Sequence, residues 1–423
     1  MDVLASREIS GLYRRLNTAA VAAPFVMRGG EGCWIESIEG ERFLDLTAGY
    51  GVASTGWNHP RIVACVREQA SRSLFAPPML VTREAAELSH ALLEVMAAPE
   101  EWRCVRATGG ADANEQVLKA VVTLAERARV PRPHRVLRYE RAYHGGTSAM
   151  LALSDIERHG LARPLSQAEH PCLPVPTSAE DIRLVTDLLE CDRSVCAVMV
   201  EPVIGSGGVH PFPIPYLRSL RELCSARGVP LIFDEVMTGC GRVGAMLAAH
   251  LAGIMPDAIT LGKGLSSGAA AVGAALVNPQ LAGVICAAED TTSTFAWSPL
   301  GCAVASETLR IIEEENLQAR AAVLGPRLRD GIAALFQGVF GDRAVVRGVG
   351  MMVGADVLRE AEGEPDAAII RCALVRCRRA GVLVGASWDW KTMVLLPPLV
   401  MTEREVEEAI VRLGHALEGL RPR

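Results

Sequence analysis

Two stretches of the sequence decide the fold: Leu231-Ile-Phe-Asp-Glu-Val-Met-Thr-Gly239 and, further along, Pro256-Asp-Ala-Ile-Thr-Leu-Gly-Lys-Gly-Leu-Ser-Ser-Gly268. Each begins with a short apolar run, which predicts a buried strand, and ends in a turn. Asp234 ends the first strand, where a carboxylate is costly to bury without a cationic partner. Lys263 follows the second strand. The two stretches therefore predict an acid and an amine at one edge of a sheet.

Lys263 is one of only three lysines in 423 residues, with Lys119 and Lys391, whereas the chain has 40 arginines (43 basic residues less 3). Arginine stays protonated, but a desolvated lysine can lose its proton and attack a carbonyl group. Lys263 is therefore the first candidate for such chemistry. Nucleotide bias in the genome would explain the arginine excess equally well, so the count serves only as a pointer.

Short apolar runs alternate with helical patterns from about residue 60 onward, which indicates an α/β fold with a mostly parallel sheet covered by helices. We expect helices at 60–73, 82–96, 113–128, 179–190 and 215–227, and strands at 103–107, 135–139, 195–200, 230–234 and 258–261. A hairpin is predicted within 25–46, further strands at 345–353 and 382–385, and a last helix from Thr402 with a capping box. Ligands bind at the carboxyl ends of strands in such sheets, so strand-end residues are the candidates for function.

Four strand-end motifs agree with one another. The run Ala107-Thr-Gly-Gly-Ala-Asp-Ala-Asn-Glu115 opens a helix and offers backbone N–H groups to an anion, and Tyr143 follows another strand with a ring that could stack on a planar ligand. Each motif alone has a structural alternative: an ordinary glycine turn, a tyrosine packed under a loop, or a helix cap for Asp234. With Lys263 they supply an anion cradle, a stacking ring, an acid and a nucleophilic amine, which are the parts that hold pyridoxal phosphate.

At this point the sequence resembles the class III pyridoxal-phosphate aminotransferases of fold type I, which include ornithine, γ-aminobutyrate and other ω-aminotransferases and glutamate-1-semialdehyde aminomutase. The resemblance runs almost end to end, through Arg28-Gly-Gly-Glu-Gly, Phe43-Leu-Asp-Leu-Thr-Ala-Gly, Gly56-Trp-Asn-His-Pro, Glu201-Pro-Val-Ile-Gly-Ser-Gly-Gly, Asp234-Glu-Val-Met-Thr-Gly-Cys-Gly-Arg, Leu261-Gly-Lys-Gly-Leu, Arg347-Gly-Val-Gly-Met and Leu396-Pro-Pro-Leu. It implies a large cofactor-binding domain at 56–304 and a smaller α+β domain built from both chain ends, 1–55 and 305–423.

Carried over position by position, the resemblance implies a role for each matching residue. Lys263 would hold the cofactor as a Schiff base and move the substrate's proton, and Asp234 would pair with the ring nitrogen. Thr294 would reach the phosphate of the neighbouring subunit, which makes a homodimer part of the site. The whole cofactor-binding set that the resemblance implies is Gly110, Ala111, Tyr143, His144, Glu201, Asp234, Val236, Met237, Lys263 and Thr294.

Three departures from the family bear on the substrate: Met237, Val394, and the tryptophans Trp57 and Trp297 where other residues are usual. Met237 stands where many members have glutamine, either as a tolerated exchange or as in the aminomutase-like branch. Val394 stands where many members have an arginine that pairs with the residue matching Glu201 and binds a substrate carboxylate. Lys391 is a poor substitute, because three residues along a strand put it on the opposite face. Carboxylate recognition must come from elsewhere, or the principal substrate is not a simple amino acid.

Three aromatic residues, Tyr50, Trp57 and Trp297, are candidates for the substrate pocket. Aromatic walls suit a ring or a sugar-like amine. Packing in the core is an equally good explanation for a tryptophan.

We therefore interpret the chain as an aminotransferase that moves an amino group from an amine donor to an aldehyde or ketone, in the biosynthesis of a specialised metabolite. A semialdehyde aminomutase or an amino-acid epimerase of the same family is the first alternative, and a non-catalytic binding protein of the same fold is the second. With 50% hydrophobic and 22% charged residues and a net charge of −6, the chain is typical of a soluble globular protein of the cytoplasm. We predict no nucleic-acid or membrane partner and, without a C-x-x-C pair, no metal site.

Overall fold

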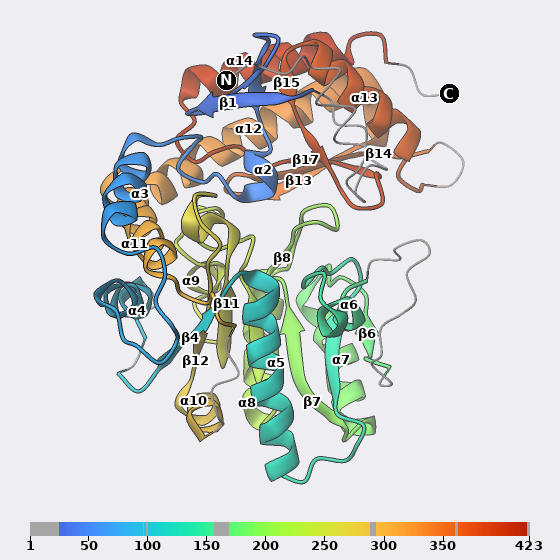
Figure 1. Ribbon diagram of the computed structural model, residues 1–423. Helices are drawn as coiled ribbons and strands as arrows, with labels where there is room; N and C mark the ends of the chain where they lie inside the picture. The colour runs from blue at the N-terminus through green and yellow to red at the C-terminus, as the bar shows by residue number, and fades with distance from the viewer. Residues whose placement is uncertain are drawn as a thin grey trace.

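The computed structural model describes residues 25–95, 97–98, 100–155, 169–287, 293–359 and 363–420. Figure 1 shows a large sheet with its helices in the lower part of the molecule. Smaller sheets lie above it, and this upper part contains both the N-terminal strand β1 (Met27–Glu31) and the C-terminal helix α14 (Glu403–Leu417). The domain boundaries predicted at 55/56 and 304/305 stay a prediction.

The large sheet has seven strands in the order β4-β12-β11-β10-β7-β5-β6. β12 runs antiparallel to both of its neighbours, and the remaining pairs are parallel. The strands are β4 (Arg103–Ala107), β5 (Arg135–Tyr139), β6 (Cys172–Leu173), β7 (Val195–Val200), β10 (Leu231–Asp234), β11 (Ala258–Leu261) and β12 (Gly273–Val277). The predicted mostly parallel α/β sheet is confirmed, with one reversed strand that the sequence did not reveal. The link from β11 to β12 is too short for a crossover helix, so the chain returns antiparallel.

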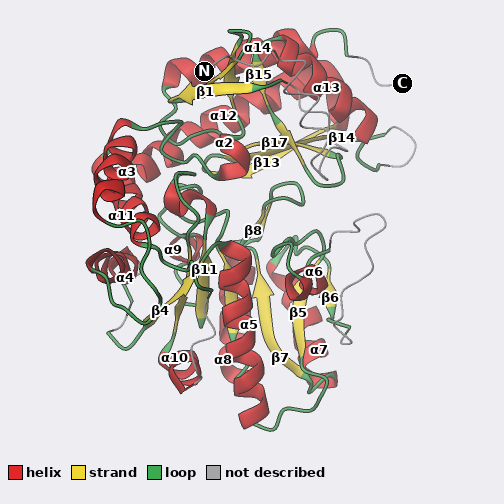
Figure 2. Cartoon of the chain, in the orientation of Figure 1, coloured by secondary structure: helices red, strands yellow, loops and turns green. Residues whose placement is uncertain are grey.

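The five helices predicted around this sheet are all present, and Figure 2 shows α5 lying in front of the strands. α5 packs against β4, β7, β11 and β12. These helices are α3 (Pro60–Arg72), α4 (Arg83–Val95), α5 (Gly110–Arg127), α7 (Ile182–Cys191), which a 3-10 turn at Ala179–Asp181 precedes, and α8 (Ile214–Arg227). Shorter helices are α2 (Ala48–Gly51), α6 (Ser148–Leu153), α9 (Ala248–Ala252), α10 (Pro279–Ala287) and the 3-10 turn η2 (Lys263–Ser266).

A second sheet joins the two ends of the chain. β2 (Trp34–Ser37) and β3 (Arg42–Asp45) form the predicted hairpin, β1 pairs with β2, and β15 (Val382–Leu383) lies parallel to β3. A pairing between residues so far apart in sequence fixes the C-terminal part of the chain against the N-terminal part.

A third sheet has the order β13-β14-β17-β16, and it corrects the sequence prediction. Residues 345–353 were expected to form one strand, but Gly350 at φ +51° turns the chain into a hairpin. The strand predicted at 382–385 is likewise divided between β15 and β16. The members of this sheet are β13 (Ala344–Val349), β14 (Met352–Val357), β16 (Gly385–Ala386) and β17 (Thr392–Leu395), and a separate short pair is β8 (Val203–Ile204) with β9 (His210–Pro211).

The remaining helices, α11 (Pro299–Glu314), α12 (Leu317–Phe340), α13 (Ala367–Arg379) and α14, complete the C-terminal part. The predicted capping box of α14 is confirmed, since Thr402 and Glu405 bond to each other's backbone N–H groups. A 3-10 turn at Gly341–Arg343 links α12 to β13. Among the described residues, no helix combines the length and the apolar character that crossing a membrane requires.

The packing of α12 on the β13–β14 turn gives a test of the fold. A Cβ added to Gly325 in α12 would lie 2.0 Å from the carbonyl oxygen of Gly350, whereas one added to Gly338 in the same helix would meet nothing within 4 Å. We expect Gly325→Ala to lower the free energy of unfolding by about 1–3 kcal/mol through overpacking. Gly338→Ala, the matched control, should raise it by about 0.5–1 kcal/mol. Urea unfolding of both variants is the measurement, and equal stability of the two would contradict this packing.

Candidate active site

The turn from β4 into α5 forms the first wall of the site. A Cβ on Gly110 would lie 2.5 Å from Val236 Cγ1, and one on Gly262 would lie 2.8 Å from the backbone nitrogen of Gly110. The turn therefore touches both strand-end motifs that the sequence singled out. The opening N–H groups of an 18-residue helix, Gly110 and Ala111 among them, have no carbonyl partner within the helix and carry its positive dipole end. This wall suits an anion.

Asp234 lies at the end of β10 with 3% of its surface exposed, and three donors surround its carboxylate. Oδ2 accepts hydrogen bonds from Nδ1 of His144 and Nδ2 of Asn114, each at 2.8 Å, and Oδ1 accepts one from the backbone nitrogen of Val236 at 3.1 Å. Asp234 therefore does not cap a helix, because these donors do not belong to the first turn of a helix. Its neighbour Glu235 is the cap: it accepts from the backbone nitrogens of Ala248 and Ala249 at α9.

Lys263 follows β11, one strand away from Asp234. The parallel register pairs Asp234 with Thr260, so Lys263, three residues further on, lies at the same edge of the sheet as the acid. Its backbone has φ +42°, in the left-handed region that non-glycine residues rarely adopt. Burial lowers the pKa of Lys263, although the charges of Glu201 and Asp234 oppose the shift. The amine is therefore easier to deprotonate than that of a lysine in water.

Glu201 connects two loops at this edge. Its carboxylate accepts hydrogen bonds from the backbone nitrogens of Tyr143 at 2.8 Å and Gly205 at 3.0 Å. Burial raises the pKa of Glu201 to about 7, although His144 and the two backbone donors act in the opposite direction. The partly exposed Tyr143 and the buried His144 thus lie in a loop that Glu201 and Asp234 both hold.

Two of the residues that depart from the family, Met237 and Val394, lie in one buried apolar cluster. Met237 packs on the backbone of the loop that follows Glu201 and contains Gly205. A Cβ on Gly205 would lie 2.1 Å from Met237 Sδ. Val394 is 3% exposed and belongs to the same cluster as Met237 and Leu396. Lys391 is partly exposed and lies 3.7 Å from the carboxylate of Glu364, so it does not join this cluster.

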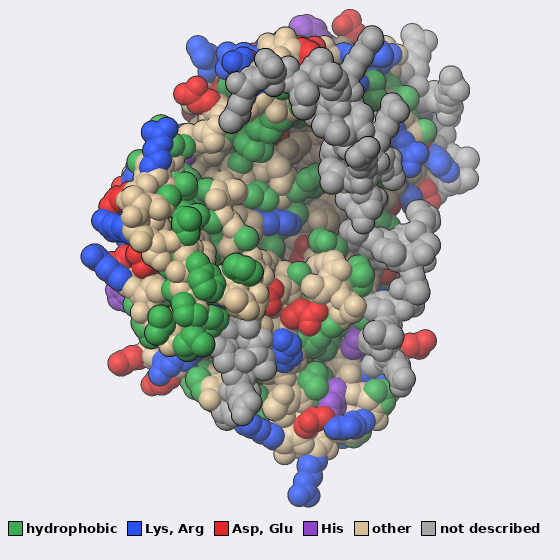
Figure 3. Space-filling view, viewed as in Figure 1, with side chains coloured by type: hydrophobic (Ala, Val, Ile, Leu, Met, Phe, Trp, Pro, Cys, Tyr) green, Lys and Arg blue, Asp and Glu red, His purple; other side chains and the backbone are tan. Residues whose placement is uncertain are grey.

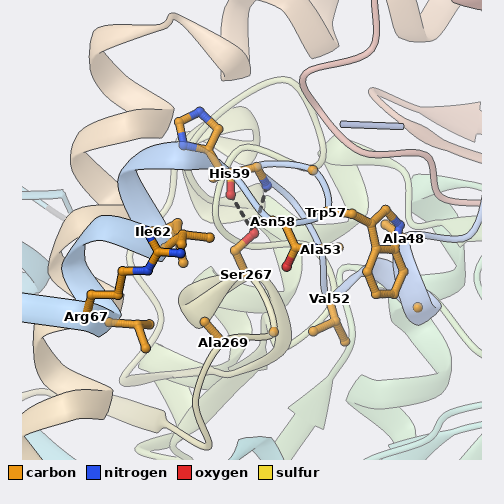
Figure 4. A pocket seen from close by; sticks show the side chains of 16 residues that line it. Ala48, Val52, Ala53, Trp57, Asn58, His59, Ile62, Arg67, Ser267 and Ala269 are labelled. Atoms are coloured by element: carbon orange, nitrogen blue, oxygen red, sulfur yellow. Dashed lines mark hydrogen bonds between the residues drawn. The ribbon is translucent and has the colours of Figure 1, made fainter. Parts of the chain in front are cut away.

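A cavity of about 620 Å³ opens beside the lysine turn (Figure 4). Trp57 and Ser267 both line it, and the indole nitrogen of Trp57 donates to Oδ2 of Asp45 at 2.8 Å. Tyr50, at the end of the neighbouring α2, is 54% exposed with its ring beside Gly385. Trp57 and Tyr50 are therefore accessible on this side of the site.

The last two candidates, Thr294 and Trp297, both lie in the segment 293–298, but their surroundings differ. Thr294 is exposed. Trp297 is 6% exposed, and its indole nitrogen donates to the carbonyl oxygen of Gly273 at 2.8 Å. This environment favours the core-packing explanation for Trp297.

Comparison with known proteins identifies the family. Residues 17–417 match the model of the class-III aminotransferases. The chain belongs to this family. It is 31% identical to the acetylornithine aminotransferase of Methanothermobacter thermautotrophicus, over 98% of this chain and all of the relative, and 29% identical to γ-aminobutyrate transaminase 1 of rice, over 95% and 82%. It also resembles the solved ornithine aminotransferase of Toxoplasma gondii, with a TM-score of 0.87, 26% identity and coverage of 98% and 95% of the two chains.

This class III aminotransferase is therefore an enzyme of fold type I whose cofactor is pyridoxal phosphate. The observed residues fit that cofactor: an anion-binding helix start, a buried carboxylate and a lysine of lowered pKa share one sheet edge. Within the described part of the chain, the buried Nε2 of His144 also has no hydrogen-bond partner.

Sequence reasoning missed several residues that shape this site. Asn114 and Thr260 bond to the acid network, Glu235 caps α9, and the fully buried Arg242 donates to the carbonyl oxygens of Met351 and Pro397. Asn114, Glu235 and Arg242 stand inside quoted motifs, but side-chain partners from other elements are not visible in one sequence. The one usable signal was the cost of burying so many polar groups without partners.

Proposed function

We propose that Lys263 would hold the cofactor through its amine and would move the proton that leaves the substrate carbon. Its lowered pKa supports this role, because the free amine is both the nucleophile and the base. The bound cofactor supplies an electron sink for the substrate's bond electrons. Asp234 would keep the ring nitrogen protonated, and this acid beside a lysine is the observation that carries the proposal.

The other predicted residues would bind and orient the cofactor. We propose that the N–H groups of Gly110 and Ala111 hold the phosphate, with Val236 and Tyr143 against opposite faces of the ring. Val236 already contacts the phosphate turn, and Glu201 fixes the backbone of Tyr143. His144 would support Asp234, and Met237 would pack beside Glu201.

The lysine provides the direct test. Lys263→Ala should lower turnover by about 10²–10⁴-fold or more, because the base is lost, while the folded protein still binds pyridoxal phosphate without a covalent bond. Lys119→Ala is the matched control, since Lys119 is exposed on α5. Turnover and cofactor absorbance are measured for both. A Lys263→Ala enzyme with the wild-type rate would overturn the assignment.

We further propose that the acceptor carries no carboxylate at a distance from its carbonyl group. The cluster around Val394 is apolar, and the arginines beside the Glu201 loop are engaged elsewhere: Arg141 with Asp389, and Arg347 with Asp356. Glu201 itself repels an anion when ionised. A neutral or cationic carbonyl compound fits these surroundings better, which supports a role in specialised-metabolite biosynthesis. A wall formed by Trp57 and Tyr50 suits a ring or sugar-like amine.

A scan of acceptors tests this substrate class. The enzyme, loaded with the amino form of its cofactor, is mixed with 2-oxoglutarate, pyruvate and neutral aldehydes, and the absorbance change is followed. A hydrogen bond to a charged group contributes about 1.5–3 kcal/mol, so the missing arginine should make 2-oxoglutarate roughly 10-fold or more slower than the best neutral acceptor. If 2-oxoglutarate reacts fastest, the proposal is wrong.

We propose that the enzyme is a homodimer and that Thr294 acts in the partner's site. The supporting feature is an exposed apolar surface formed by the loop between α3 and α4 and the segment that carries Thr294. Val81 is 90% exposed, Phe295 is 68% exposed, and the rings of Phe75 and Phe295 lie 5.8 Å apart. Figure 3 shows hydrophobic side chains gathered over this part of the molecule. A second copy covering this surface would remove it from water.

Mixed dimers test the role of Thr294 in the partner. Lys263→Ala and Thr294→Ala each impair every site of their own homodimer. A mixed dimer has one site with both wild-type residues if Thr294 acts across the interface, so mixing should raise activity above the mean of the two parents. Lys119→Ala mixed with Thr294→Ala is the control, because its activity should equal the mean of its parents whether or not the subunits exchange. Activity equal to the mean after proven exchange would show that Thr294 does not act in the partner's site.

We also propose a cytoplasmic location. The twelve cysteines, all within described residues, are free, which fits a reducing compartment.

A further inference from the structure

The acid network contains a residue that the cofactor roles leave unexplained. Asn114 lies in α5 and is fully buried. Its Nδ2 donates to Oδ2 of Asp234 and to the carbonyl oxygen of His144, each at 2.8 Å. Its Oδ1 accepts a hydrogen bond of 2.6 Å from Oγ1 of Thr260, which is also fully buried. Every polar group of the Asn114 side chain is thus engaged.

These partners leave one orientation for the amide. The carboxylate of Asp234 and the carbonyl of His144 can only accept hydrogen bonds, so the NH₂ group must face them. The hydroxyl of Thr260 must then donate to Oδ1. If the amide turned over, its oxygen would face two oxygens in a fully buried site, which is costly.

The same contacts tie four elements together. Asn114 comes one turn after the start of α5, whose first residues face the proposed phosphate position. Asp234 ends β10, His144 belongs to the loop after β5, and Thr260 lies beside Asp234 in the register of β10 and β11. A displacement of the Asn114 amide therefore moves the acid and the Tyr143–His144 loop relative to the anion-binding turn.

We propose that Asn114 is a positioning residue that orients Asp234 and His144, and that Thr260 holds its amide in the required direction. This inference rests on the proposed role of Asp234. His144 and Asn114 both occupy Oδ2, whereas Oδ1 carries a single bond from Val236. Oδ1 is therefore the oxygen with capacity left for a protonated ring nitrogen.

The test measures binding of pyridoxal phosphate to the apoenzyme, without reference to turnover. Asn114→Ala should weaken binding roughly 10- to 100-fold, the loss expected for a hydrogen bond to a charged group. Asn114→Asp keeps the shape but replaces the donor with an acceptor, so at pH 8 it should be worse than Asn114→Ala. Lowering the pH protonates the introduced carboxyl and should restore part of the binding, which a mere packing role does not predict. Asn114→Asp that is milder than Asn114→Ala at every pH would overturn the proposal.

A double-mutant cycle tests the part of Thr260. Thr260→Val should weaken cofactor binding several-fold in the wild type and have no further effect together with Asn114→Ala. Thr308→Val, which removes an equally buried hydroxyl from α11, is the control and should leave binding unchanged. Additive losses would contradict the proposed link between Thr260 and Asn114. If changes at Asn114 prevent folding, Thr260→Val alone serves as the test.

Asp234→Asn, measured in parallel, separates this inference from the proposed function. If Asp234→Asn binds the cofactor and turns over like the wild type, both the acid's role and the inference are wrong. If Asp234→Asn is impaired while the Asn114 and Thr260 variants bind normally, only the inference fails.

Discussion

The carboxylate of Asp234 at the buried end of β10 is the constraint on which the site depends. An ionised group in this position is tolerated only if donors surround it. The chain supplies them from a helix, a loop and its own turn, through Asn114, His144 and Val236. Satisfying one charge therefore brings together segments that are far apart in the sequence. Under the proposed function, the cofactor ring would provide the cation that this carboxylate still lacks.

Close backbone contact is the second constraint. Gly110 and Gly262 leave no room for a Cβ, so the anion-binding turn packs directly on Val236, two residues after the acid, and on Gly262, the residue before the lysine. The three motifs therefore pack against one another at the end of the sheet. Arg242 extends this rigidity to the third sheet, because its buried guanidinium donates to the carbonyl oxygens of Met351 and Pro397. Burial lowers the pKa of Arg242 to about 10, within the range where it still carries its charge at neutral pH.

The substrate side of the site differs from the cofactor side in chemical character. The cofactor side is polar and hydrogen-bonded, whereas Met237, Val394 and Leu396 belong to an apolar cluster in which Met237 packs against Gly205. Glu201 accepts backbone hydrogen bonds from two loops, so it stabilises their positions. The chain keeps the fold and the cofactor of the family, and the proposed change concerns only the recognition of a distant carboxylate.

The sequence by itself determined the α/β class, the strands that end in Asp234 and Lys263, and the family, because strand periodicity and strand-end motifs are local patterns. It failed where local patterns are ambiguous: the small-residue strand β12 has little strand signal, and the apolar run 345–353 hides a turn at Gly350. It also could not separate the three aromatic candidates. Only the tertiary structure decided that Trp297 is buried with a bonded indole while Trp57 lines a cavity, and that Asn114 meets Asp234. Hydrogen-bond partners and burial depend on which elements pack together, and a single sequence carries no direct record of those distances.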